Sequence, residues 1–195
     1  MYQSNKNEEF IHQNFQKKVL GGFTLVETLV AISILLGSIT APMLIASRGI
    51  SITALARDQV MAAYLAQDAV EYVMAKKKQN SLNEILGNST GWLLNLDTPC
   101  GAPNGCIVDT LYDLVQPTPA TACAATCSPL KFNNVTGAYG YGSGADWTDS
   151  RFTRKVVISS LNTHEAVLEV TIVWKNSVLV QKSFTIKTNI FDTVL

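Results

Sequence analysis

The chain has 195 residues, enough for one domain with appended segments. Charged residues make up only 15% of it, against roughly 25% in an ordinary soluble domain, whereas hydrophobic residues make up 47%. The formal net charge of +0, with no basic patch interleaved with aromatic residues, argues against a nucleic-acid-binding domain.

Residues 1–22 are polar, rich in Asn and Gln, and have no apolar core ahead of Lys17 and Lys18. An ordinary secretory signal carries its apolar core before the cleavage site. Here the apolar residues follow the pair Gly21 and Gly22, so they would stay with the mature protein. The sequence therefore predicts a cytosolic leader, and its two lysines agree with the positive-inside rule.

Residues 23–47 form an apolar run about as long as a membrane-spanning helix, and Glu27 is its only charge. A lone carboxylate in such a segment costs about 2.5–3.5 kcal/mol at mid-depth and less near the interface, which makes Glu27 a candidate functional residue. Gly37 and Pro42 mark a candidate helix break, because proline cannot donate to the carbonyl four residues earlier.

Residues 48–86 are predicted to continue this helix outside the membrane as an amphipathic helix. Glycine and asparagine at 87, 88 and 91 are expected to end it. The apolar face predicted from the helical spacing comprises Ile52, Ala56, Val60, Ala63, Val70 and Met74. The face predicted to meet solvent comprises Arg57, Gln59, Gln67, Asp68 and Glu71.

Three consecutive lysines, at positions 76–78, are expected to form the C-terminal end of that amphipathic helix. Positive charge at this end suits the helix dipole. The sequence therefore favours a solvated helix end over a phosphate-binding site.

The four cysteines lie beyond the apolar run, within the predicted extracytoplasmic domain 87–195. An even count on one side of a membrane segment indicates disulfides in an oxidising compartment. The alternative is a zinc site, but the spacings C-x5-C and C-x3-C fit zinc ligands poorly, so no metal is expected. About three pairings are open to four cysteines. We favour the local one, Cys100 with Cys106 and Cys123 with Cys127.

The domain 87–195 is predicted to have a loop-rich part, 87–150, and a strand-rich part, 151–195. Within the first part, a short strand is expected at 107–115, and the glycine-rich run 137–144 is expected to be a surface loop, since it lacks the residue order of a phosphate-binding loop. Its tyrosines would either pack back on the domain or stay exposed for contacts.

Residues 151–195 alternate between apolar and polar types, which predicts three antiparallel strands joined by turns at 160–165 and 175–177. One face of this meander would be buried under the amphipathic helix, which gives an α+β fold of one long helix on a small sheet. The residues expected on that face are Phe152, Arg154, Val156, Ile158, Leu168, Val170, Ile172, Trp174, Val178, Val180, Phe184, Ile186 and Ile190, with Lys182 and Thr188 as exceptions.

The sequence offers no constellation typical of an enzyme. The two histidines, His12 and His164, lie in the leader and in a predicted turn, and no G-x-S-x-G nucleophile motif occurs. We therefore expect neither a catalytic site nor a cofactor.

The segment Gly22-Phe23-Thr24-Leu25-Val26-Glu27, with lysines before it and an apolar run after it, resembles the cleavage and methylation motif of type IV prepilins and pseudopilins. The resemblance implies that prepilin peptidase cuts the Gly22–Phe23 bond, that Phe23 is N-methylated, and that Glu27 sets the register between subunits. Gly22 has no Cβ, so a peptidase can approach the backbone closely. A cut after Gly21 is the alternative, although Phe23 fits better as the first residue.

Residues 56–73 resemble the helix of V-type minor pilins, with the pattern A-x-x-L-A-Q-x-x-x-E, and Phe152-Thr153-Arg154 with the strands that follow is similar to the same group. Pro42 lies nearer the mature N-terminus than in many major pilins. The resemblance implies a pilin-like fold and a minor type IV pilin, a filament subunit that primes or modifies a surface pilus. It implies single-pass insertion in the inner membrane first, and a place in the filament afterwards.

The implied partners are prepilin peptidase, other pilin or pseudopilin subunits, an inner-membrane assembly platform and membrane lipid. The alternatives within the family are a type II secretion pseudopilin and a DNA-uptake pseudopilin, the only variant for which nucleic acid would be a partner. An alternative of another class is a membrane-anchored extracytoplasmic binding domain that does not polymerise.

Overall fold

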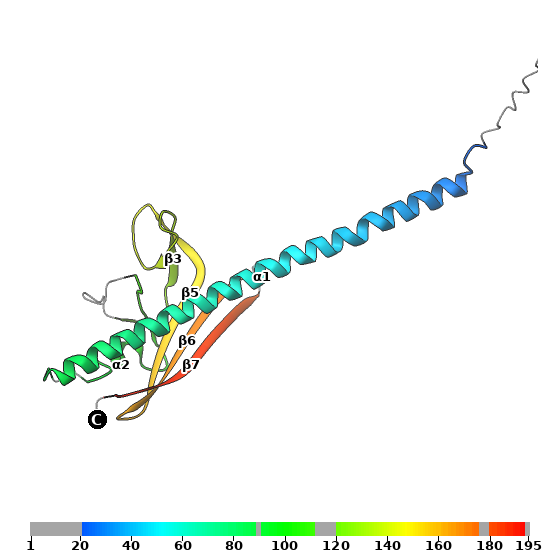
Figure 1. The fold of residues 1–195 in the computed structure, drawn as a ribbon. Helices are drawn as coiled ribbons and strands as arrows, with labels where there is room; N and C mark the ends of the chain where they lie inside the picture. Colours follow the sequence, from blue (N-terminus) through cyan, green and yellow to red (C-terminus); the bar gives the residue numbers. More distant parts are fainter. Residues whose placement is uncertain (1–20, 89–90, 112–119, 176–179, 194–195) are drawn as a thin grey trace, which may run out of the picture. The chain divides into compact units, whose positions relative to one another are not determined.

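The computed structural model describes residues 21–88, 91–111, 120–175 and 180–193, and the chain divides into two compact units, 1–49 and 50–195. The leader lysines and His12 lie outside the described residues. The helix α1 (Leu25–Ile85) contributes to both units (Figure 1). The second unit also contains the short helix α2 (Asp97–Cys100) and a seven-stranded sheet. Its strands are β1 (Cys106–Ile107), β2 (Thr121–Ala122), β3 (Pro129–Asn133), β4 (Tyr139–Gly140), β5 (Trp147–Asn162), β6 (Glu165–Lys175) and β7 (Gln181–Phe191).

In the first unit, α1 is long and apolar enough by length and composition to cross a membrane. It continues as helix through Gly37 and Pro42, and the kink or loosening expected at Pro42 stays a prediction. Pro42 removes one backbone donor, but a membrane helix tolerates that loss when the turns on either side remain hydrogen-bonded. The Ser38 hydroxyl also bonds back to the helix, donating to the carbonyl of Leu35 at 2.7 Å.

The sheet of the second unit is centred on β5, which pairs with β6 along one edge and with β3 and β1 along the other. All strand pairs in the sheet are antiparallel. β5, β6 and β7 form the predicted meander, which is confirmed (Figure 1). The described residues show a tight turn at Thr163 and His164 between β5 and β6, within the predicted range. Much of the second predicted turn, with Val178, lies outside the described residues.

One face of the meander packs against residues 50–85 of α1, as predicted for an α+β fold. The inward residues of β5 and β6 match the prediction: Phe152, Arg154, Val156, Ile158, Leu168, Val170, Ile172 and Trp174 are all at most 3% exposed. On β7, Ile190 is buried and Phe184 and Ile186 are half-buried, whereas Val180 is 46% exposed and was wrongly placed on this face.

The helix face that covers the sheet matches the predicted one only in part: Val70 and Met74 pack against the core as predicted. Ile52 and Val60 are 67% and 56% exposed, so they do not belong to the packed face. At about 100° per residue, positions 60 and 62 point in nearly opposite directions, and Ala62 is the buried one. Small residues let the helix approach the sheet closely, and this explains the buried face. It comprises Asp58, Ala62, Leu65, Ala66, Ala69, Tyr72, Val73, Lys76, Asn80 and Ser81.

The lysines at 76–78 do not form a solvated helix end, because α1 continues to Ile85. Lys76 is buried, 9% exposed, and its Nζ donates to Oε1 of Gln79 at 3.2 Å. Lys78 is exposed.

The predicted strand at 107–115 is much shorter in the structure, where β1 ends at Ile107. Residues 108–111 do not continue the strand, and Asp109 accepts hydrogen bonds from the amides of Leu111 and Tyr141. Residues 112–115 lie outside the described residues. The glycine-rich run 137–144 is not wholly a loop, because it contains β4 paired with β3. Its Tyr139 packs against the rings of Phe132 and Phe152, with centroid distances of 5.1 and 6.0 Å.

Two disulfides are present, Cys100–Cys106 and Cys123–Cys127, which is the local pairing favoured from the sequence. The first is in the core, since both its cysteines are 0% exposed. The second closes a surface loop, because Cys127 is half-buried and residues 124–126 are exposed.

We expect a water-soluble reductant to open Cys123–Cys127 first and to reach Cys100–Cys106 only when the domain unfolds. Disulfide exchange requires access of a thiolate to a sulfur atom, which burial denies. Alkylation at increasing reductant concentration, followed by peptide mass spectrometry, measures the order. Simultaneous labelling of both pairs in the folded chain would contradict this expectation.

Candidate functional site

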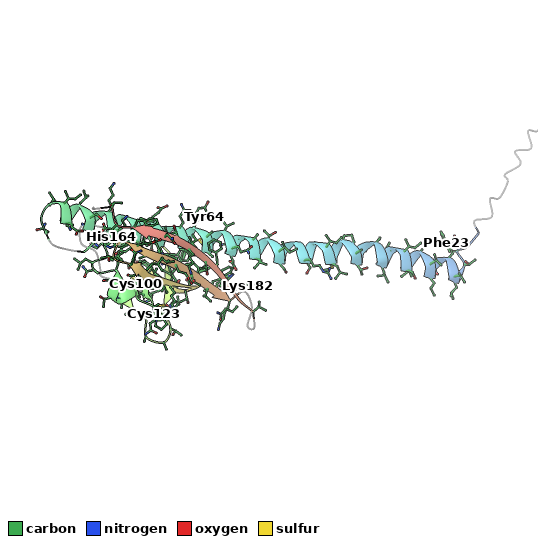
Figure 2. All side chains as sticks on the ribbon, turned by 90° about the horizontal axis from the view of Figure 1, so that it is seen from below. Phe23, Tyr64, Cys100, Cys123, His164 and Lys182 are labelled. Atoms are coloured by element: carbon green, nitrogen blue, oxygen red, sulfur yellow. A yellow bond between two sulfur atoms is a disulfide. The ribbon has the colours of Figure 1, made fainter. Side chains whose placement is uncertain are left out.

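The bond predicted to be cut lies in a non-helical segment immediately before α1. Residues 21–24 are not helical, and α1 begins at Leu25. Phe23 is 80% exposed (Figure 2), and no atom of another part of the chain lies within 4 Å of the Cβ positions built on Gly21 or Gly22. A peptidase therefore meets the Gly22–Phe23 bond with no side chain on the glycine and no helical hydrogen bond to break.

The first turn of α1 is fixed by a capping interaction between Thr24 and Glu27. The Thr24 hydroxyl accepts a hydrogen bond from the backbone N–H of Glu27 at 3.2 Å. Thr-x-x-Glu is the sequence of a capping box, in which the threonine satisfies one free N–H of the first turn. This bond uses the backbone of Glu27 and not its carboxylate.

The carboxylate of Glu27 is exposed, and it has no hydrogen-bond or ion-pair partner among the residues that the structure describes. Its position in the first turn of α1 places the negative charge near the positive end of the helix dipole. After a cut at Gly22, the new amine of Phe23 would lie about 6 Å away along the axis, at 1.5 Å per residue. The carboxylate could pair with this amine or with that of another subunit.

The side chains that follow Glu27 on α1 are exposed up to position 50 within the described chain. Apolar residues exposed in this way need to be covered by lipid or by other helices. The large ones are Leu29, Val30, Ile32, Ile34, Leu35, Leu36, Ile39, Met43, Leu44 and Ile45, all at least 49% exposed.

A second group of polar residues holds α1 to the sheet within the 50–195 unit. The centre of this group is Arg154 on β5, whose side chain is 0% exposed. Its Nη1 donates to Oδ2 of Asp68 at 3.1 Å and to the carbonyl of Leu65 at 3.2 Å, and its Nη2 donates to the carbonyl of Val108 at 2.7 Å. The hydroxyl of Thr110 also donates to Asp68. Arg154 thus joins the helix, the sheet and the segment after β1.

The sequence assigned Arg154 to the buried face but gave no partner for it, and it assigned Asp68 to the solvent face. The structure brings the two together, because the side chain of Asp68 is only 49% exposed and lies at the border of the packed face. A second pair, Asp58 with Arg151 at 3.0 Å, also went unpredicted. An arginine that alternates with apolar residues on a strand was the one available signal for such a partner.

Tyr141 lies beside this group. Burial raises the pKa of Tyr141 above its usual value; the Arg154 guanidinium opposes that rise and Asp109 adds to it. Its hydroxyl is buried and faces the Arg154 guanidinium. Tyr141 therefore stays neutral at physiological pH and adds no charge to the group.

The described ranges contain no group of three His, Cys, Asp or Glu residues that could hold a metal ion. His164 lies in the turn between β5 and β6, and its Nδ1 is 3.4 Å from Oδ2 of Asp192. Figure 2 shows His164 near one end of the sheet and Lys182 near the other. The structure therefore gives His164 a carboxylate neighbour beside a turn.

Comparisons of the chain with models of known protein families, with curated proteins and with solved structures found no match.

Proposed function

We propose that this chain is a minor type IV pilin, a structural subunit that prepilin peptidase processes and that enters, or primes, a surface pilus. The single observation that carries the proposal is the motif from Gly22 to Glu27 at the start of an exposed apolar helix. Several features of the first turn support it together. The Gly22–Phe23 bond lies outside the helix and is accessible, and a cut there would make Phe23 the first mature residue. The carboxylate of Glu27 has no partner within the described chain.

In the first turn of α1, the capping interaction involves the backbone of Glu27 and not its side chain. Thr24 satisfies the backbone N–H of Glu27, which leaves the Glu27 side chain available for another subunit. An exposed carboxylate in an apolar segment is costly unless an ammonium compensates it. The methylated amine of a neighbouring Phe23 would be such a partner, and the pair would form only when two helices are correctly staggered.

The type II secretion pseudopilin and the DNA-uptake pseudopilin share this motif and this chemistry. The genes beside this one separate them: a secretin with secretion components favours the first, and a retraction ATPase with other pilins favours the pilus. The alternative of another class is the non-polymerising anchor, with which the Thr24–Glu27 helix cap is equally compatible. Charge removal at Glu27 distinguishes the anchor from an assembly subunit.

Substitution of Gly22 by Ile should block processing. A branched side chain next to the bond would keep the peptidase from the backbone, whereas glycine presents none. We expect the rate of cleavage to fall at least tenfold, which corresponds to about 1.4 kcal/mol of activation free energy. An immunoblot of membranes with active prepilin peptidase, sampled over time, measures this rate.

Gly21→Ile is the matched control, because it places the same side chain one residue farther from the bond. Both glycines have open space around them, so neither substitution disturbs packing. We expect Gly21→Ile to be cut at least several times faster than Gly22→Ile. The reverse order would move the cut to the bond after Gly21, and full cleavage of both variants would contradict the proposal.

A further inference from the structure

A groove of about 640 Å³ opens on the second unit, between the Cys123–Cys127 loop and the ends of β5, β6 and β7. Its strand residues include Arg151, Thr153 and Lys155 of β5, and these alternate with the buried residues Phe152 and Arg154. Neighbouring positions on a strand point to opposite faces. The groove therefore opens on the sheet face of Thr153 and Lys155, and its edge reaches α1, because Arg151 also contacts Asp58.

The charges that line this groove are all positive. The whole chain balances 15 basic against 15 acidic residues. Against this balance, the lining includes the cations Arg151, Lys155 and Lys175 and no carboxylate. Hydroxyl groups of Thr126, Ser150 and Thr153 lie among the lining residues as further hydrogen-bond donors.

Two of these cations are held in place by other parts of the domain. Nη1 of Arg151 contacts Oδ2 of Asp58 at 3.0 Å, and the Arg151 side chain remains 56% exposed. Because this contact uses one nitrogen, the guanidinium keeps donors that Asp58 does not use. Nζ of Lys155 donates to the carbonyl of Pro103 at 2.8 Å, a neutral partner outside the lining that does not offset its positive charge.

Lys175 differs from the other two, because its side chain is exposed and its ammonium has no partner among the described residues. It ends β6, where it pairs with Gln181 of β7. The carboxylate of Asp58 offsets one of the three charges, yet its side chain is 11% exposed and is not part of the lining. The groove therefore keeps a net positive charge.

We propose that this groove binds a ligand through an oxyanion group, that is, a carboxylate, a phosphate or a sulfate. Arg151 supplies planar donors that match such a group, and Lys175 supplies a mobile ammonium that closes on it. Lys155 adds a fixed positive charge beside them. The site lies on the extracytoplasmic unit and is independent of whether the chain polymerises.

The test uses the isotope-labelled full chain in uncharged detergent micelles, titrated at low ionic strength with inorganic phosphate and, separately, with citrate. We expect saturable shifts of the backbone amide signals of Thr153 and Lys175. Lys175→Gln should weaken the binding about fivefold or more, since one exposed charge contact contributes about 1 kcal/mol. Saturation by phosphate alone assigns the site to phosphate esters, by citrate alone to carboxylates, and by both to oxyanions in general.

Lys182→Gln is the matched control. Lys182 is one residue from Gln181 and pairs with Trp174, so it lies on the opposite face of the sheet, yet its loss changes the net charge by the same amount. We expect binding to be unchanged in this variant. Equal weakening by both substitutions would overturn the proposal. So would the absence of saturation by either probe up to about 10 mM, a dissociation constant that corresponds to a binding free energy of only about 3 kcal/mol.

Discussion

Glu27→Gln should lower incorporation of the chain into filaments at least tenfold, while cleavage and membrane insertion continue. A hydrogen-bonded contact with a charged group contributes about 1.5–3 kcal/mol, and tenfold corresponds to about 1.4 kcal/mol. Insertion should equal or exceed that of the wild type, because the substitution removes a charge from the apolar segment. Immunoblots of sheared surface material and of the membrane fraction measure the two quantities.

Thr24→Ala is the control that separates the charge from the helix cap. It removes the hydroxyl that accepts from the N–H of Glu27 and leaves the carboxylate in place. Loss of such a cap costs about 0.5–2 kcal/mol of helix stability, but it should leave incorporation within about threefold of the wild type. Wild-type incorporation of Glu27→Gln would contradict the assembly role of Glu27, and absence of the unsubstituted chain from the sheared surface material would favour the non-polymerising anchor.

Arg154→Met should be the most destabilising single substitution that we propose for the second unit. It removes the three bonds of a side chain that is 0% exposed and leaves the carbonyl of Val108 without the Arg154 donor. A buried acceptor without its partner costs about 1–3 kcal/mol. At about 2–4 °C per kcal/mol for a chain of this size, thermal unfolding should begin roughly 5 °C lower.

Two variants calibrate that effect. Asp68→Asn should cost less than Arg154→Met, because the side chain of Asp68 is 49% exposed and water can replace part of the contact. Lys187→Gln breaks a pair whose side chains are 64% and 40% exposed, at 3.3 Å, and should change the free energy of unfolding by less than about 1 kcal/mol. Equal free energies of unfolding for the Arg154 and Lys187 variants would contradict the conclusion that Arg154 holds the helix, the sheet and the segment after β1 together.

The meander and the long N-terminal helix could be predicted from the sequence because their signals are local. The alternation of apolar and polar residues along β5 and β6 predicts which side chains face the helix. This prediction is confirmed for the inward residues from Phe152 to Trp174, which are all buried. The local disulfide pairing also held. In each case the interacting residues are either neighbours in the chain or share one simple period.

The helix face and the small strands could not be read in the same way. The buried face of α1 mixes alanines and larger apolar residues with polar residues such as Asp58 and Lys76, so residue type alone does not mark it. β3 pairs with β4 and with the first residues of β5, and β4 has only two residues, so neither short strand carries an alternation long enough to predict. The Arg154–Asp68 contact spans 86 positions and exists only once helix and sheet are packed.

Mass spectrometry of the mature N-terminus tests the central claim most directly. The chain should be purified from cells with active prepilin peptidase and digested, and its N-terminal peptide sequenced. We predict a peptide that begins at Phe23 and carries one additional methyl group on its amine. A peptide that begins at Met1, or a mature chain with an unmodified residue other than Phe23 first, would contradict the account.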